Sequence, residues 1–85
     1  MKIFWYTNCP NCNNQGNLNI MKNQTTSELY LHCDECEWGW RDPTKILNSD
    51  AKFMTLLEDF HSVPATWDEI VSSNWQIFAR NASIE

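Results

Sequence analysis

Two pairs of cysteines constrain the fold of this chain more than any other feature. Cys9 and Cys12 form one Cys-x-x-Cys motif, Cys33 and Cys36 form a second, 20 residues lie between the motifs, and the chain has no other cysteine. Each motif can place two thiolates on one tight turn, and two such turns at the ends of neighbouring hairpins supply the four sulfur ligands of a tetrahedral zinc ion. We therefore predict a structural Zn²⁺ site with these four cysteines as its ligands.

Other uses of the cysteines fit the sequence less well. A thioredoxin-like redox pair at Cys9 and Cys12 needs a strand–helix–strand context and leaves the second pair unexplained. Two disulfides suit a secreted protein, but the apolar opening of the chain, residues 1–6, is too short for a secretion signal. Iron stays open, because iron centres also take four cysteine thiolates. We expect reduced, metal-bound thiols and therefore a cytoplasmic protein.

The length of the chain, 85 residues, predicts a single domain with a thin margin of stability. A structural zinc ion contributes on the order of 10–16 kcal/mol of apparent binding free energy near neutral pH, which rivals the whole stability of a small domain. We expect at least the first half of the chain to unfold when the metal is removed.

The order of apolar and polar residues predicts an α+β fold whose first part, residues 1–41, is the sheet. Runs of apolar and aromatic residues predict strands at residues 2–7, 18–22, 28–32 and 37–41. Together they would make a small antiparallel sheet of three or four strands with zinc at one end. Period two places Trp38 and Trp40 on one face of the last strand, and Gly39 leaves the other face open.

Residues 42–80 are expected to cover the open face of the sheet with two C-terminal helices. Asp42 and Pro43 suit the N-cap and the first position of a short helical turn. Apolar residues three and four positions apart predict the first helix: Phe53, Leu56, Leu57 and Phe60.

A capping box of Thr66 and Glu69 predicts the start of the second helix. Its apolar face would extend to about Arg80 and consist of Trp67, Ile70, Val71, Trp75 and Phe78. Residues 81–85 are expected to be a frayed tail.

The paired cysteine turns at the ends of hairpins resemble the zinc-ribbon family. The resemblance covers about half of the chain, rests on the two cysteine motifs, and implies that all four cysteines are metal ligands in a ribbon sheet. Ribbons often have glycine after the second cysteine of each pair, and this chain has Asn13 and Glu37 there. Asparagine tolerates the left-handed backbone that such a turn often needs at that position.

The charge balance favours a protein partner over a nucleic acid. The chain has eleven Asp and Glu residues against six Lys and Arg, which gives a formal net charge of −5. An acidic surface repels phosphate backbones and suits a basic protein. The basic residues are scattered and form no stripe, and no apolar run is long enough to cross a membrane.

Four carboxylates gather in the sequence around the second cysteine pair: Asp34, Glu35, Glu37 and Asp42. They form either a solvated turn or an acidic docking patch that speeds association with a cationic partner. Trp38 and Trp40 are either interface anchors or the sheet side of the core. We treat all six residues as candidates for a partner-binding surface.

The functional expectation is a non-enzymatic protein. Four cysteines leave no open metal position for water, and the chain contains no phosphate loop, nucleophile elbow or metalloprotease helix. Compact, acidic, single-domain bacterial proteins of this shape look like immunity proteins of toxin systems, some of which carry zinc ribbons. We expect a zinc-stabilised, stoichiometric protein-binding module of the immunity or antitoxin type, which neutralises a basic toxin or nuclease. The alternative is a zinc-ribbon protein associated with the transcription or translation machinery or with nucleic acid.

Overall fold

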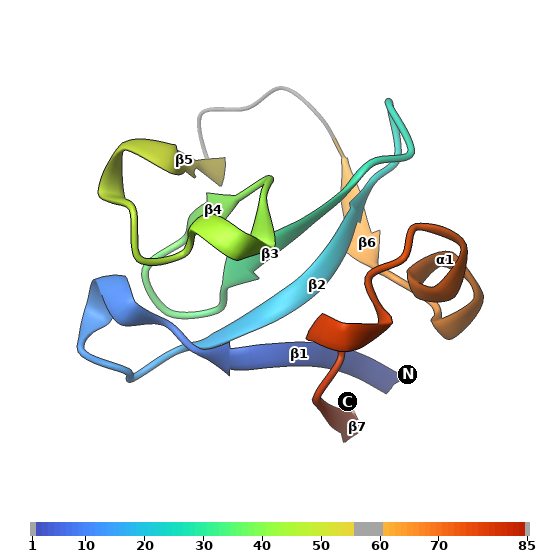
Figure 1. Ribbon diagram of the computed structural model, residues 1–85, viewed down its shortest axis with the longest axis horizontal. Coiled ribbons are helices and arrows are strands. Elements are labelled where there is room, and N and C mark those ends of the chain that lie inside the picture. Colours follow the sequence, from blue (N-terminus) through green and yellow to red (C-terminus); the bar gives the residue numbers. More distant parts are fainter. Residues whose placement is uncertain (1, 56–60, 85) are drawn as a thin grey trace.

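The computed structural model describes residues 2–55 and 61–84, and these form one antiparallel sheet with short helical turns (Figure 1). The strand order is β5-β4-β3-β2-β1-β7, and β6 also pairs with β2. The strands are β1 (Lys2–Asn8), β2 (Asn17–Asn23), β3 (Leu29–Cys33), β4 (Trp38–Trp40), β5 (Lys52–Met54), β6 (Ser62–Pro64) and β7 (Asn81–Ile84). The helical elements are α1 (Trp67–Ser72) and the 3₁₀ turns η1 (Pro10–Cys12), η2 (Pro43–Lys45), η3 (Ser49–Ala51) and η5 (Gln76–Phe78).

Strand β2 is central because three strands pair with it. Strand β3 pairs along one edge of β2. The other edge is shared between β1, where Trp5 lies opposite Asn19, and β6, where Pro64 lies opposite Met21. Strands β1 and β6 therefore separate along β2, as the two arms of a fork.

The core lies on the face of the sheet that carries Leu18, Ile20 and Leu31, which are fully buried. The asparagines of β2 alternate with Leu18 and Ile20 and are half-buried, as period two requires. Ile70 of α1 and Trp40 of β4 are fully buried as well. Burial of each such aliphatic side chain contributes about 1.5–3 kcal/mol. Cys9 and Cys33 belong to the same buried cluster, so the cysteine site is continuous with the core.

The four strands expected in residues 1–41 are present, but the predicted α+β fold, a sheet of three or four strands covered by two C-terminal helices, is wrong. The described residues form mostly antiparallel sheet, with seven strands. Residues 43–54 form two 3₁₀ turns followed by β5, and the only α-helix among the described residues has six residues. Phe53, which was expected to begin a helical stripe, lies in β5 opposite Gly39. The rest of that stripe, Leu56, Leu57 and Phe60, lies outside the described residues.

An available strand edge explains this correction. The side chain of Asn48 accepts a hydrogen bond from the backbone of Asp50 and caps the start of η3, and this turn ends at Ala51, where the chain reaches the edge of β4. A helix needs a costly first turn, whereas the edge of β4 offers the next residues backbone partners at once. Phe53 therefore lies on a strand edge and not on a helix face.

The capping box predicted at Thr66 and Glu69 is confirmed. The hydroxyl oxygen of Thr66 accepts from the Glu69 backbone, and the Glu69 carboxylate accepts from the Thr66 backbone. The helix stops early because Asn74 adopts a left-handed φ of 61°. The backbone of Trp75 then donates to the carbonyl of Ile70, which closes the helix in the manner of a Schellman turn.

The expected frayed tail and the expected open face at Gly39 are also corrected. Residues 81–84 form β7 on the outer edge of β1. A Cβ atom at Gly39 would lie 2.8 Å from the Leu31 carbonyl oxygen and 2.9 Å from Cγ2 of Thr55, so this face is covered. Tyr30, on the same side, is buried with its ring centroid 5.6 Å from that of Phe53. Within the described ranges, no helix has both the length and the hydropathy to cross a membrane.

Candidate metal centre

The four cysteine sulfur atoms meet at one end of the sheet. The Sγ atoms of Cys9 and Cys36 are 3.8 Å apart, those of Cys12 and Cys33 are 3.7 Å apart, and all four lie within 4.8 Å of one another. Zn–S bonds of about 2.3 Å in a tetrahedron place sulfur atoms about 3.8 Å apart. A disulfide needs about 2.05 Å, and the four cysteines are free thiols. The cluster can therefore hold a metal ion, and each short contact joins one cysteine turn to the other.

The first cysteine turn spans residues 9–16, and we call it the first knuckle. Pro10 begins η1. The two residues that follow this turn, Asn13 and Asn14, have left-handed φ angles of 57° and 64°. The backbone of Cys9 donates to the carbonyl of Gly16 at 2.8 Å, which closes the loop. Asparagine adopts this backbone with less strain than most residues, so Asn13 serves where ribbons often have glycine.

The second cysteine turn spans residues 33–37, and we call it the second knuckle. Backbone N–H groups of Glu35 and Cys36 each donate to Cys33 Sγ at 3.4 Å. Glu37 has a left-handed φ of 65°, a conformation that costs a residue of this type about 1–2 kcal/mol. Its carboxylate Oε2 lies 2.6 Å from Nε2 of His32, and its carbonyl accepts from the backbone and hydroxyl of Thr55, so these contacts hold the strained residue.

Gly16 is a residue of the site that sequence reasoning assigned only to a solvated loop. A Cβ atom there would lie 2.4 Å from Sγ of Cys33, closer than non-bonded atoms approach. The backbone N–H of Gly16 also donates to Sγ of Cys12 at 3.4 Å. Its place among asparagines in the sequence gives no signal of this contact, because the partner sulfur comes from the other knuckle.

Burial and hydrogen bonds shift the thiol pKa values in opposite directions. Burial raises the pKa of Cys9 and of Cys33, whose thiolates would be poorly solvated. Burial also acts to raise the pKa of Cys36, but hydrogen bonds from the Trp38 backbone and the Asn11 side chain outweigh it and lower that pKa. Buried thiolates are stabilised by a cation, and a divalent metal ion is one that this cluster can hold.

The acidic residues predicted for a partner surface differ in exposure and in their hydrogen bonds. Asp34 and Glu35 are exposed on the second knuckle, where Oδ1 of Asp34 accepts from the Asn17 backbone at 2.9 Å. Glu37 is half-buried against His32, which therefore has a carboxylate partner and is not one of the residues of the cysteine cluster. Asp42 caps η2 through the hydroxyl and backbone of Thr44, and these hydrogen bonds lower its pKa.

The two tryptophans of β4 differ in exposure. Trp40 is only 1% exposed, so it belongs to the core and is not available as an interface anchor. Trp38 is half-buried, and Nζ of Lys52 lies 4.6 Å from the centroid of its ring. The sequence left open whether these tryptophans are interface anchors or core residues, and the burial of Trp40 favours the core for that residue.

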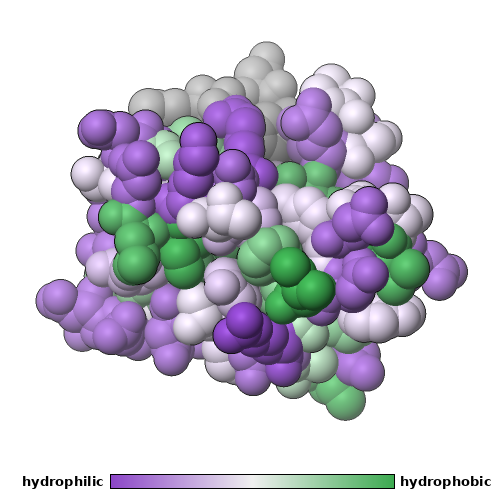
Figure 2. Space-filling view, in the orientation of Figure 1, coloured by the Kyte–Doolittle hydropathy of each residue, from purple (hydrophilic) through white to green (hydrophobic). Residues whose placement is uncertain are grey.

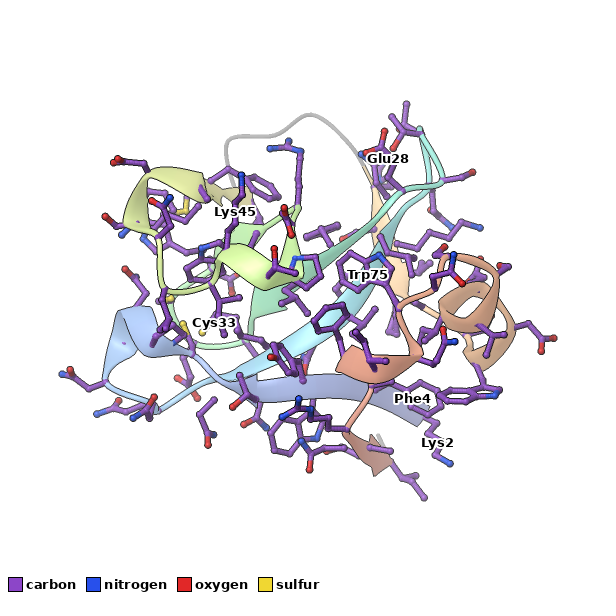
Figure 3. The ribbon with its side chains drawn as sticks, in the orientation of Figure 1. Lys2, Phe4, Glu28, Cys33, Lys45 and Trp75 are labelled. Carbon is purple, nitrogen blue, oxygen red and sulfur yellow. The ribbon has the colours of Figure 1, made fainter. Side chains whose placement is uncertain are left out.

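An exposed aromatic surface lies elsewhere, at Trp67, which the sequence assigned to an apolar helix face. Trp67 is 47% exposed, and its ring centroid is 5.4 Å from that of Phe4. Together they border an open cleft of about 730 Å³ in the fork between β1 and β6, lined by Lys2, Phe4, Pro64, Ala65, Thr66 and Trp67. Figure 3 shows Lys2 and Phe4 at the opposite end of the sheet from Cys33.

No protein-family model, curated protein or solved structure matches this chain. The zinc-ribbon resemblance therefore rests on the four cysteines and the geometry described above.

Proposed function

We propose that the cysteine cluster binds one Zn²⁺ ion as a structural metal. The observation that carries this proposal is the pair of Sγ–Sγ distances, 3.7 and 3.8 Å, each of which joins the two knuckles. Four thiolates at tetrahedral spacing suit zinc, while harder cations prefer oxygen ligands. Bound zinc would supply a cross-link between the turns that carry Cys9 and Cys33, and iron is the competing metal.

We further propose that the protein acts by binding another protein. Four protein ligands complete a tetrahedral site and leave no position for water or substrate. The cluster therefore suits a metal that holds the fold together, and the surface of the molecule would perform the function. Figure 2 shows separate hydrophobic areas on one face, bordered by hydrophilic side chains, which is the mixed character of transient interfaces.

The charges favour a basic partner. The net charge is −5, and four basic side chains lie over aromatic rings: Lys2, Arg41, Lys52 and Arg80. Lys22 forms an ion pair with Glu69. A nucleic-acid surface instead gathers its cations in a stripe that follows the phosphates. A protein-binding module for a cationic partner therefore agrees better with this surface than a nucleic-acid-binding ribbon does.

The narrower proposal is that the partner is a basic toxin or nuclease, which this protein neutralises as an immunity protein does. It is supported by small size, acidic charge and a closed metal site, and it is an analogy at the level of the fold. A gene for a toxic protein beside the gene for this chain would support it.

Elemental analysis of protein expressed in zinc- and iron-containing medium tests the metal. We expect one zinc per chain. We also expect the protein to lose its fold when a chelator removes the metal, which circular dichroism would detect. Protein that is metal-free yet fully folded, or that holds iron, would contradict the assignment.

Charge reversal tests the contact surface. We expect Glu35→Lys, on the exposed second knuckle, to slow association with the basic partner at low salt. The matched control is Glu28→Lys, which makes the same charge change at the other end of β3 (Figure 3). Equal rates for both variants would exclude the knuckle as the docking face, and retention on DNA or RNA that weakens steeply with salt would contradict a protein partner.

A further inference from the structure

Asn11 and Lys52 form a chain of contacts that ends on one sulfur atom of the metal centre. Nδ2 of Asn11 lies 3.6 Å from Sγ of Cys36 on the other knuckle, and Oδ1 of Asn11 accepts from Nζ of Lys52 at 2.6 Å. The three residues come from the first knuckle, the second knuckle and β5. These contacts link segments that are far apart in the sequence.

The chemistry of the lysine fixes the direction of the asparagine. An ammonium group has three donors and no acceptor, so only the carbonyl oxygen of the Asn11 amide can face Lys52. The amide nitrogen then necessarily faces Cys36. Lys52 itself is held by the ring of Trp38, 4.6 Å from its Nζ, and by pairing of its backbone opposite Trp40.

The sulfur atom of Cys36 is partly exposed, so a hydrogen bond that holds it in place matters more than it would for a buried sulfur. Cys9 and Cys33 are fully buried, whereas Cys12 and Cys36 are partly exposed and open to water or a competing ligand. Among the described residues, and apart from the cysteines themselves, Asn11 is the side chain that donates a hydrogen bond to one of the four sulfur atoms. A zinc ion with four thiolates has a formal charge of about −2, and a neighbouring cation offsets part of it.

We propose that Asn11 and Lys52 are positioning residues that hold Cys36 on the metal and slow metal release. This inference rests on the zinc site proposed above. Asn11 donates to the sulfur, and Lys52 acts through Asn11 by setting the orientation of its amide. Groups that orient metal ligands in this way typically change metal affinity by about 10- to 100-fold when they are removed.

Transfer of zinc from the loaded protein to an excess of a chromogenic chelator measures the release rate. We expect Asn11→Asp to release zinc at least about 10-fold faster, because the carboxylate keeps Lys52 but offers the sulfur no donor. Lys52→Met should also accelerate release, and Lys52→Arg should restore a rate near that of the unmodified protein. The controls are Gln15→Glu, with the same charge change in the same exposed loop, and Lys45→Met, which removes an exposed lysine elsewhere.

Asn11→Asp separates this role from a purely structural one. If Asn11 only tied the knuckle to β5 through Lys52, the aspartate would preserve the tie and leave the release rate unchanged. The resonance of ¹¹³Cd, loaded in place of zinc, should also shift in Asn11→Asp and not in Gln15→Glu.

Release rates within twofold of the unmodified protein for both Asn11→Asp and Lys52→Met would overturn the proposal. Should Asn11→Asp fail to fold, Lys52→Met tests it alone, because it leaves both knuckles intact. An unmodified protein that binds no zinc would instead contradict the proposed metal site, so the two failures are distinguishable.

Discussion

The knuckle end of the sheet and the helix end, which comprises β6, α1 and β7, are stabilised by different interactions (Figures 1 and 3). At the knuckle end, two turns with left-handed residues meet at four sulfur atoms. At the helix end, Ile70 is buried in the core, a capping box begins α1, and Lys22 pairs with Glu69. The first arrangement can hold a metal ion, whereas the second consists of contacts between protein groups alone.

This difference indicates that a short chain can be stabilised by different interactions at its two ends. The core joins the two ends, because Cys9, Cys33 and Ile70 belong to one buried cluster. A change at either end should therefore lower global stability, but only a change at the knuckle end should also affect the metal.

Replacement of a metal ligand should have the largest effect. Cys33→Ser removes a fully buried sulfur, so we expect loss of metal binding together with most of the stability, up to the order of the 10–16 kcal/mol that structural zinc contributes. Zinc content and urea unfolding would be measured on the same sample. Full zinc content in this variant would contradict the ligand assignment.

Truncation of the core at the helix end should come next. Ile70 is fully buried, so Ile70→Ala should lower the free energy of unfolding by about 2–5 kcal/mol. One zinc per chain should remain. Loss of zinc from this variant under native conditions would show that the two ends are not separable.

A methyl group at Gly16 should disturb the knuckle end without removing a ligand. The clash with Cys33 Sγ predicts that Gly16→Ala costs about 1–3 kcal/mol and weakens metal binding. Gly39→Ala is the matched control, because its clash is with the Leu31 carbonyl and Thr55 and should reduce stability with unchanged metal affinity. The same metal affinity in both variants would be evidence against the close approach at Gly16.

The ion pair at the helix end should have the smallest effect, and its sign depends on pH. The hydrogen bond from Lys22, with the capping bond from Thr66, lowers the pKa of Glu69 below its unfolded value. Its contribution is therefore present above the unfolded pKa of about 4.3 and is lost as pH falls through the folded pKa. The stability difference between the unmodified protein and Glu69→Gln should be constant from pH 7 to about 5 and shrink below that. A difference that grows on acidification would contradict the assigned sign.

Much of the first half of the molecule could be predicted, because its signals are local. Alternation at Leu18 and Ile20 predicted β2, and cysteine spacing predicted which sulfur atoms would meet. The capping box at Thr66 involves residues three positions apart and is equally local. What failed was the assignment of Phe53 to a helix, because an apolar spacing of three or four does not reveal whether a strand edge is available.

The sequence by itself determined the four cysteines of the candidate metal site, the two turns that present them, and the strands that lead into those turns. Tertiary structure alone decided that residues 52–54 and 81–84 become strands, because their backbone partners lie on the distant edges of β4 and β1. It also decided that Gly16 must lack a side chain and that Asn11 faces Cys36, since both contacts cross from one knuckle to the other. The physical reason is that ligand chemistry and capping act within a few residues, whereas strand pairing and packing depend on groups that only the complete fold brings together.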